Sequence, residues 1–150
     1  MENIWTKINE SIEIYFKDII KCYNMKVVKI SPLKTAMVQR EFALIISVDR
    51  FSADVSYLIR EKEDNNLKLL PCGNFFAEKF TCEDRRDLLQ GDTAENMVIN
   101  NLIVINNGLK NNWSDVLEGN VSWIADYEKS KWYEIVSLNM EEEKLLSQYI

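Results

Sequence analysis

The stretch FALIISVDRFSADVSYLIR, residues 42–60, decides the fold that this sequence predicts. Residues 42–48 form a nearly continuous apolar run, which is typical of a central strand with both faces covered. From residue 51 to residue 60 apolar and polar side chains alternate, and this period of two predicts a strand with one wetter face. The pair Asp49-Arg50 can join the two strands as a hairpin, although it lacks the Asn-Gly signature. The stretch therefore predicts two neighbouring antiparallel strands.

Segments on both sides extend this pair into a larger sheet. Residues 25–30 read as a short strand that stops at Ser31-Pro32. Residues 61–66 are polar enough for a turn, and residues 67–70 can return as a strand before Pro71. We therefore expect an antiparallel β-meander of three to four strands.

The chain before the meander carries a helical pattern. Apolar residues recur there at spacings of three and four, which predicts one amphipathic helix over residues 3–23. The stripe consists of Ile4, Ile8, Ile12, Phe16, Ile19, Ile20 and Tyr23. A helix that binds a partner is one interpretation, but we favour a helix whose stripe lies on its own sheet.

After Pro71 the pattern becomes mostly helical. Thr81 can cap a short helix that runs through Leu89. Asp92, with Glu95 three residues later, forms a capping-box-like start for a helix that we expect to end at Gly108. Residues 97–105 within it are rich in β-branched side chains, so a strand remains an alternative there.

The last forty residues contain shorter signals. Residues 114–117 can form one turn that ends at Gly119, and residues 123–127 suit a short helix. Residues 131–138 could form a helix or a strand. Asn139, with Glu142 three residues later, predicts the cap of a last helix.

The length and composition support one compact unit. A chain of 150 residues with 47% apolar side chains can bury its own core without disulfides or metals. The segments described above combine helices and an antiparallel meander. We therefore expect a single α+β domain over residues 1–150, with an N-terminal helix, the meander and a mostly helical C-terminal half.

The charge of the chain is unevenly distributed. The formal net charge is −6, yet residues 1–40 hold seven basic and four acidic side chains. Residues 41–150 hold eleven basic and twenty acidic side chains, so the acidic excess belongs to the later part. Because phosphate binding needs a basic patch, we expect no nucleic-acid partner.

The composition also excludes much catalytic chemistry. The sequence has no histidine, which excludes Ser-His-Asp and Cys-His couples and histidine-ligated zinc. It has four glycines and neither a G-x-G-x-x-G nor a Walker A motif, so nucleotide cofactors are not expected. We expect no cofactor and no bound metal.

The cysteines and the hydropathy indicate the compartment. Cys22, Cys72 and Cys82 are odd in number and lack a C-x-x-C spacing, so we expect three buried, reduced thiols. The first residues lack the layout of a signal peptide, and no apolar run reaches the roughly 20 residues that span a bilayer. We therefore expect a cytoplasmic protein without membrane association.

Two remaining catalytic possibilities are weak. Asp126 and Glu128 could serve as paired carboxylates, but residues two apart on a helix point in different directions. Cys82 is the best candidate nucleophile because it precedes two arginines, but the negative charges of its neighbours Glu83 and Asp84 disfavour a thiolate there. We therefore expect no enzymatic activity.

The region from residue 113 to residue 134 combines aromatic with acidic side chains. Tryptophan and tyrosine are favoured interface anchors, and acidic side chains steer a basic partner. The candidate partner-binding residues are Trp113, Asp115, Glu118, Asp126, Tyr127, Glu128, Tyr133 and Glu134. The alternative is that the aromatics fill the core, which we prefer for Trp123 and Trp132.

As a small acidic α+β domain rich in Asn, Ile and Lys, without a catalytic constellation, the whole chain resembles the immunity proteins of bacterial contact-dependent inhibition and related polymorphic toxin systems. The resemblance implies tight, non-covalent occlusion of the active site of a cognate toxin. If that toxin is a nuclease, its site is basic, and an acidic inhibitor would mimic nucleic acid.

The chain is also similar to the class I type III secretion chaperones, which are small, acidic α+β proteins. That similarity implies a dimer that holds an unfolded effector segment. The long helical second half fits this family less well. A small enzyme is a third interpretation, which the missing histidine and scarce glycines disfavour.

Overall fold

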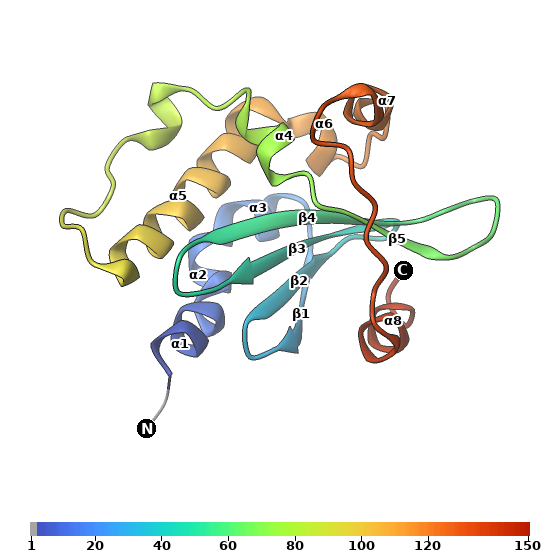
Figure 1. Ribbon diagram of the computed structural model, residues 1–150, viewed down its shortest axis with the longest axis horizontal. Coiled ribbons are helices and arrows are strands. Elements are labelled where there is room, and N and C mark those ends of the chain that lie inside the picture. Colours follow the sequence, from blue (N-terminus) through green and yellow to red (C-terminus); the bar gives the residue numbers. More distant parts are fainter. Residues whose placement is uncertain (1–2) are drawn as a thin grey trace.

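The computed structural model describes residues 3–150 and has the expected α+β architecture (Figure 1). Its sheet is a five-stranded antiparallel meander in which neighbours in sequence are neighbours in space. The strands are β1 (Lys26–Ser31), β2 (Lys34–Val38), β3 (Phe42–Val48), β4 (Ala53–Arg60) and β5 (Leu67–Leu70). N-terminal helices precede the sheet and a mostly helical half follows it.

The run at residues 42–48 is the central strand, as predicted. Both faces of β3 are buried, and it pairs with β4 in a register that sets Leu44 opposite Tyr57. Asp49 closes the hairpin, because its Oδ1 accepts hydrogen bonds from the backbone N–H groups of Phe51 and Ser52. These two hydrogen bonds stabilise the turn, so the hairpin does not need an Asn-Gly pair.

The strand β2 is the one that the sequence pattern did not predict, so the sheet has five strands instead of three to four. The stop that we assigned to Ser31-Pro32 is the turn of a hairpin, across which Ser31 pairs with Lys34. Residues 35–38 are all buried, so their short apolar run lacks the alternation that marks a half-exposed strand.

The N-terminal segment buries most of its predicted apolar stripe, although Ile4 is exposed, and it is not one helix. It forms α1 (Ile4–Glu10), α2 (Ile12–Tyr15) and α3 (Lys17–Cys22), which meet at Ser11 and Phe16. The Ser11 hydroxyl donates to the carbonyl of Lys7, a local bond that competes with helix continuation.

The prediction of helices over residues 81–108 is confirmed for the long helix, but it is wrong for the extent of the short helix and for the cap at Asp92. The N-cap of the long helix is Thr93, whose side chain accepts a hydrogen bond from the Asn96 N–H. Thr81 forms a capping box with Asp84, yet it opens only a four-residue 3-10 helix, η1 (Cys82–Arg85). A short helix, α4 (Gly73–Ala77), precedes it. The long helix α5 (Ala94–Asn112) includes residues 97–105, so the strand alternative there is excluded.

Gly108 does not end α5, contrary to our expectation. It lies within the helix, where a Cβ atom would collide with the ring of Phe80. Gly108 keeps a helical backbone conformation, and its missing side chain leaves room for the ring of Phe80, so the helix continues to Asn112.

The C-terminal elements are α6 (Ser114–Leu117), α7 (Trp123–Lys129) and α8 (Met140–Leu146). The predicted turn at Gly119 is confirmed by its φ of 92°. The cap of the last helix is confirmed too, because Asn139 Oδ1 accepts from the Glu142 N–H at 2.8 Å.

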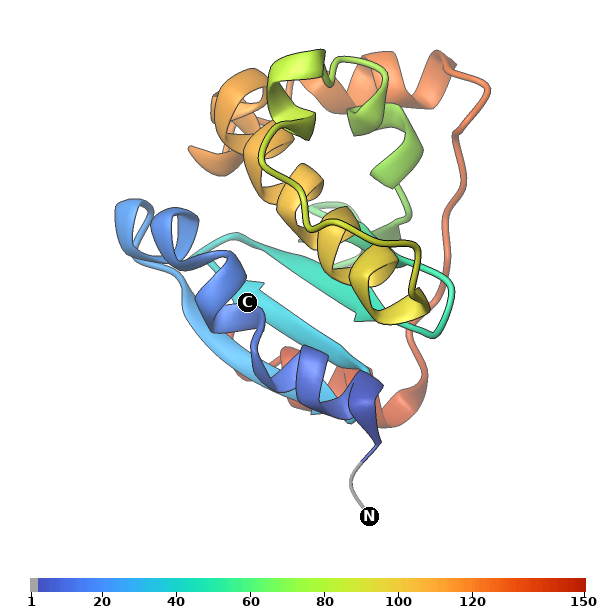
Figure 2. The same ribbon diagram turned by 90° about the vertical axis from the view of Figure 1, so that its left-hand side faces the viewer.

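Residues 131–138 are neither a helix nor a regular strand. From α7 this segment passes β5, with one bridge between Leu69 and Val136, and leads to α8 on the other side of the sheet (Figures 1 and 2). Its side chains are mostly exposed, so no packing partner imposes a regular element on it.

The sheet separates two hydrophobic cores. The larger core joins one sheet face to α1–α5 and to the aromatic side chains of α6 and α7. On the other face, Ala43, Ile45 and Leu58 pack with Leu146 of α8. None of the helices within residues 3–150 combines the length and the apolar character that crossing a membrane requires.

Candidate functional site

The aromatic side chains of the predicted partner-binding region lie mostly in the core. Trp113 is 2% exposed and Tyr127 is 0% exposed, so these two predicted contacts have no surface to offer. The indole N–H of Trp113 donates to the carbonyl of Phe76 at 2.9 Å. Tyr133, at 41% exposure, is the predicted aromatic contact that reaches solvent. The interpretation of these aromatics as core therefore holds for two of the three.

The acidic side chains of the same region have the opposite environment. Four are exposed and Asp115 is half-buried. None of the five forms an ion pair with any residue that the structure describes. We call this set the acidic region; it consists of Asp115, Glu118, Asp126, Glu128 and Glu134. Its carboxylates are therefore free to meet an external cation.

The buried aromatics fix the backbone that carries the acidic region. Trp123 and Tyr127 of α7 pack against Phe75 of α4, with ring centroids 6.1 and 5.4 Å away. The Tyr127 hydroxyl donates to the Glu134 carbonyl at 3.1 Å, and it lies at the same distance from the Glu134 N–H as acceptor. The segment after α7 is thereby held against the helix.

The cysteines differ in exposure, which corrects the expectation of three buried thiols. Cys72 is buried, whereas Cys22 and Cys82 are exposed and free. Desolvation raises the pKa of the Cys72 thiol far above its ordinary value, so this side chain is inert at neutral pH. Cys22 lies at the end of α3 and Cys82 in the polar loop around η1, where no apolar layer covers them.

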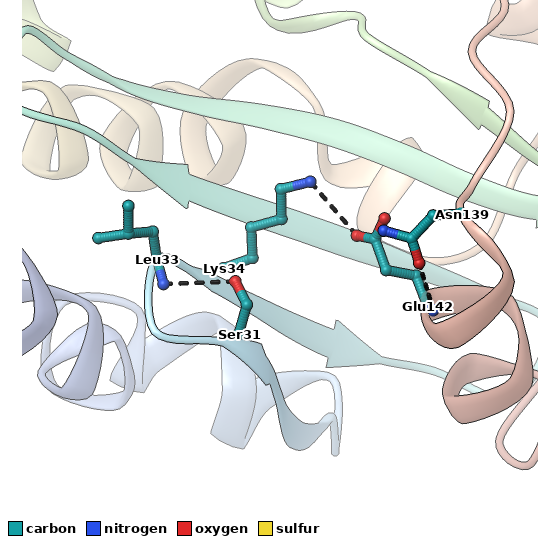
Figure 3. Close-up of polar contacts among 5 residues, drawn as sticks. All are labelled: Ser31, Leu33, Lys34, Asn139 and Glu142. Carbon is teal, nitrogen blue, oxygen red and sulfur yellow. Dashed lines mark hydrogen bonds and ion pairs between the residues drawn. The ribbon is translucent and has the colours of Figure 1, made fainter.

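A hollow of about 210 Å³ lies between the β1–β2 turn and the start of α8. Figure 3 shows that several of its polar groups bind one another. The Lys34 ammonium is 3.3 Å from a Glu142 carboxylate oxygen, and the Ser31 hydroxyl accepts from the Leu33 N–H. We interpret this hollow as the joint between α8 and the sheet.

A larger pocket, which we call the β4–α5 pocket, has a volume of about 310 Å³. It lies between the start of β4, α4, the loop around η1 and the middle of α5. Its polar lining consists of Ser52, Asp54, Asn74, Arg85 and Asn101, and its apolar lining includes Val55, Phe80, Val104 and Ile105. Volumes of this size are typical of small-ligand sites.

Asp54 has the most perturbed environment in this pocket. Part of its side chain is exposed, but neighbouring atoms crowd the carboxylate, and this desolvation raises its pKa above the usual value. A hydrogen bond from the Val55 N–H opposes the shift, and the charge of Asp49 adds to it. Gly73 makes room for the carboxylate, because a Cβ atom there would collide with Asp54 Oδ1.

Arg85 reaches the pocket from a loop that α5 holds in place. The neighbouring Asp84 is 0% exposed, and its carboxylate accepts from the amides of Asn111 and Asn112 at 2.7 and 2.8 Å. It also accepts from the Thr81 N–H at 2.7 Å. Burial alone would raise the pKa of Asp84, but these hydrogen bonds outweigh it and lower the pKa.

No protein-family model, curated protein or solved structure matched this chain. Within residues 3–150, no three Cys, Asp or Glu side chains gather closely enough to hold a metal ion.

Several asparagine side chains hold a loop against α5, a structural role that the sequence analysis did not assign to them. The Asn100 amide binds both the N–H and the carbonyl of Leu89, and Asn96 donates to the carbonyl of Gln90. Together with Asn111 they fasten the loop of residues 81–91 to α5. The signal was present in the sequence, because Asn96 and Asn100 are four residues apart on one helix face.

Proposed function

We propose that this chain is a non-catalytic binding protein that neutralises a cognate bacterial toxin by covering the active site of the toxin. The acidic region is the proposed contact, with Tyr133 as its exposed aromatic side chain. The observation that carries the proposal is the set of five carboxylates without an ion pair among residues 3–150. No cationic side chain neutralises these carboxylates, so their negative potential can attract a positively charged partner.

The partner that fits is a folded protein with a basic active-site surface. A nuclease must attract phosphate groups, so its site is positive and complementary to the acidic region. The chain carries nine more acidic than basic side chains after residue 40. The same charge would repel nucleic acid and anionic membranes.

Rigid support of the acidic region favours binding. The aromatic contacts of Trp123 and Tyr127 hold α7 against α4. A preorganised surface loses little conformational entropy when its partner binds.

The exposed free thiols of Cys22 and Cys82 suit a reducing cytoplasm, where we propose that the protein acts.

The first experiment is co-purification with the product of the neighbouring gene. A folded basic toxin domain, bound one to one and inhibited, would support the proposal. An unfolded effector segment held by a dimer of this chain would contradict it in favour of a chaperone. Turnover of a substrate by the isolated chain would contradict it in favour of an enzyme.

A charge-reversal experiment then tests the acidic region itself. The variant Asp126→Lys with Glu128→Lys should slow association with that toxin at low ionic strength and flatten its salt dependence. The control is Glu10→Lys with Glu13→Lys, which makes the same charge change at two exposed positions of α1 and α2. If the two variants had equal effects, the net charge of the chain would explain the change in association, and α7 would not be part of the interface.

A further inference from the structure

The β4–α5 pocket contains charges of both signs that do not neutralise each other. The Asp54 carboxylate and the Arg85 guanidinium both line it. Neither forms an ion pair with the other or with any residue among 3–150. The Asp54 carboxylate accepts one hydrogen bond within the described residues, from the N–H of Val55. Two opposite charges in one pocket are thus available to a single ligand.

The rest of the lining supplies neutral hydrogen-bonding groups and an apolar wall. The side chains of Ser52, Asn74 and Asn101 make no hydrogen bond to other residues that the structure describes. Their neighbour Asn100, by contrast, is fully used in holding Leu89. The apolar wall is formed by Phe80, Val104 and Ile105. A few polar groups beside an apolar wall are the usual composition of a small-ligand site.

We propose that the β4–α5 pocket binds a small zwitterion, namely an α-amino acid with an aliphatic side chain. The ligand carboxylate lies against Arg85, whose planar guanidinium matches a carboxylate with two parallel hydrogen bonds. The ligand ammonium donates to Asp54. The aliphatic side chain lies against Val104 and Ile105.

Charge balance favours a zwitterion over a simple anion or cation. An anion would satisfy Arg85 but bring a second negative charge close to Asp54, and an amine would do the reverse. A zwitterion pairs both groups and leaves the pocket neutral, so neither charge loses water without a partner. The volume of about 310 Å³ also accommodates a molecule of this size.

The test uses L-leucine as the probe, added at millimolar concentration to the full chain labelled with ¹⁵N. We expect saturable chemical-shift changes for the amide signals of β4, α4 and the middle of α5. Two analogues of leucine test its charged groups separately. 4-Methylpentanoate lacks the ammonium group, and 3-methylbutylamine lacks the carboxylate group. Each should bind at least about tenfold more weakly than leucine, because each leaves one charge of the pocket unpaired.

Matched variants test the two protein groups. Asp54→Asn and Arg85→Gln should each weaken leucine binding at least about tenfold. The controls Asp92→Asn and Arg86→Gln change charges outside the pocket lining and should leave the affinity unchanged. Absence of leucine-induced shifts would overturn the proposal, as would equal binding of leucine and 4-methylpentanoate. The analogue comparison uses the unmodified chain, so it decides the matter even if a variant fails to fold.

Discussion

Replacing Asp84 with alanine should destabilise the chain more than replacing any exposed acidic residue. The Asp84 carboxylate is fully buried, and three short hydrogen bonds reach it from Thr81, Asn111 and Asn112. A fourth, longer bond of 3.3 Å comes from the Thr81 hydroxyl. These contacts join η1 to the end of α5, so their loss should free the loop that carries Arg85.

The size of the effect follows from these bonds. A hydrogen bond to a charged group contributes about 1.5–3 kcal/mol, but Asn111 is exposed and its amide can return to water. The carboxylate also lies beside the C-terminal turn of α5, whose partial negative charge opposes it. We therefore expect Asp84→Ala to lower the free energy of unfolding by about 2–4 kcal/mol.

Asp84→Asn should cost less, about 1–2 kcal/mol. Its carbonyl oxygen can accept from Thr81 and Asn112, while the Asn111 amide turns over to accept from the new NH₂ group. The measurement is urea unfolding, with Asp92→Ala as the control because Asp92 is exposed. If Asp84→Ala were no more destabilising than Asp92→Ala, the hydrogen bonds described for Asp84 would not exist in solution.

The pH dependence gives an independent check. The folded chain lowers the pKa of Asp84, so its stabilising contribution is complete above the unfolded pKa of about 3.9 and disappears as the pH falls through the folded value. The difference in stability between the parent chain and Asp84→Asn should therefore shrink below about pH 4. A difference that stays constant across this range would refute the assignment.

Three further predictions concern other parts of the fold. Gly108→Ala should lower the free energy of unfolding by about 1–3 kcal/mol in a urea titration, and Phe80→Leu should relieve part of that loss. Asn9→Ala should cost about 1–3 kcal/mol in the same assay, because the buried Thr35 hydroxyl donates to Asn9 Oδ1. A thiol reagent should modify two cysteines in the folded chain and the third only after unfolding; the reactive pair is Cys22 and Cys82, and the protected one is Cys72. Rapid labelling of all three in native buffer would contradict the structure.

Local signals predict those elements whose cause is local. The apolar run of residues 42–48 and the alternation after Phe51 are sufficient to predict the two central strands. Caps at Thr81 and Asn139 are predictable because each binds a backbone N–H three residues away. The strand β2 escapes prediction because both of its faces are covered, and a short run of that kind carries no period.

For the candidate partner-binding residues, the sequence predicts the exposure of the charged side chains but not the burial of the aromatic ones. Acidic side chains remain at the surface unless they are paired, so the exposure of Asp126 and Glu128 follows from composition. Whether Trp113 and Tyr127 face water depends on Phe75 and Phe76, which lie more than thirty residues earlier in the chain. No local pattern carries that information.

The sequence by itself determined the α+β class, the meander, the caps at Thr81 and Asn139 and the acidic character of the later chain. Only the tertiary structure decided that Trp113 and Tyr127 are core residues and that Gly108 makes room for Phe80. It also brought Asp54 and Arg85 into one pocket. The physical reason is that periodicity and capping act over three or four residues, whereas burial and pockets depend on which distant segments pack together.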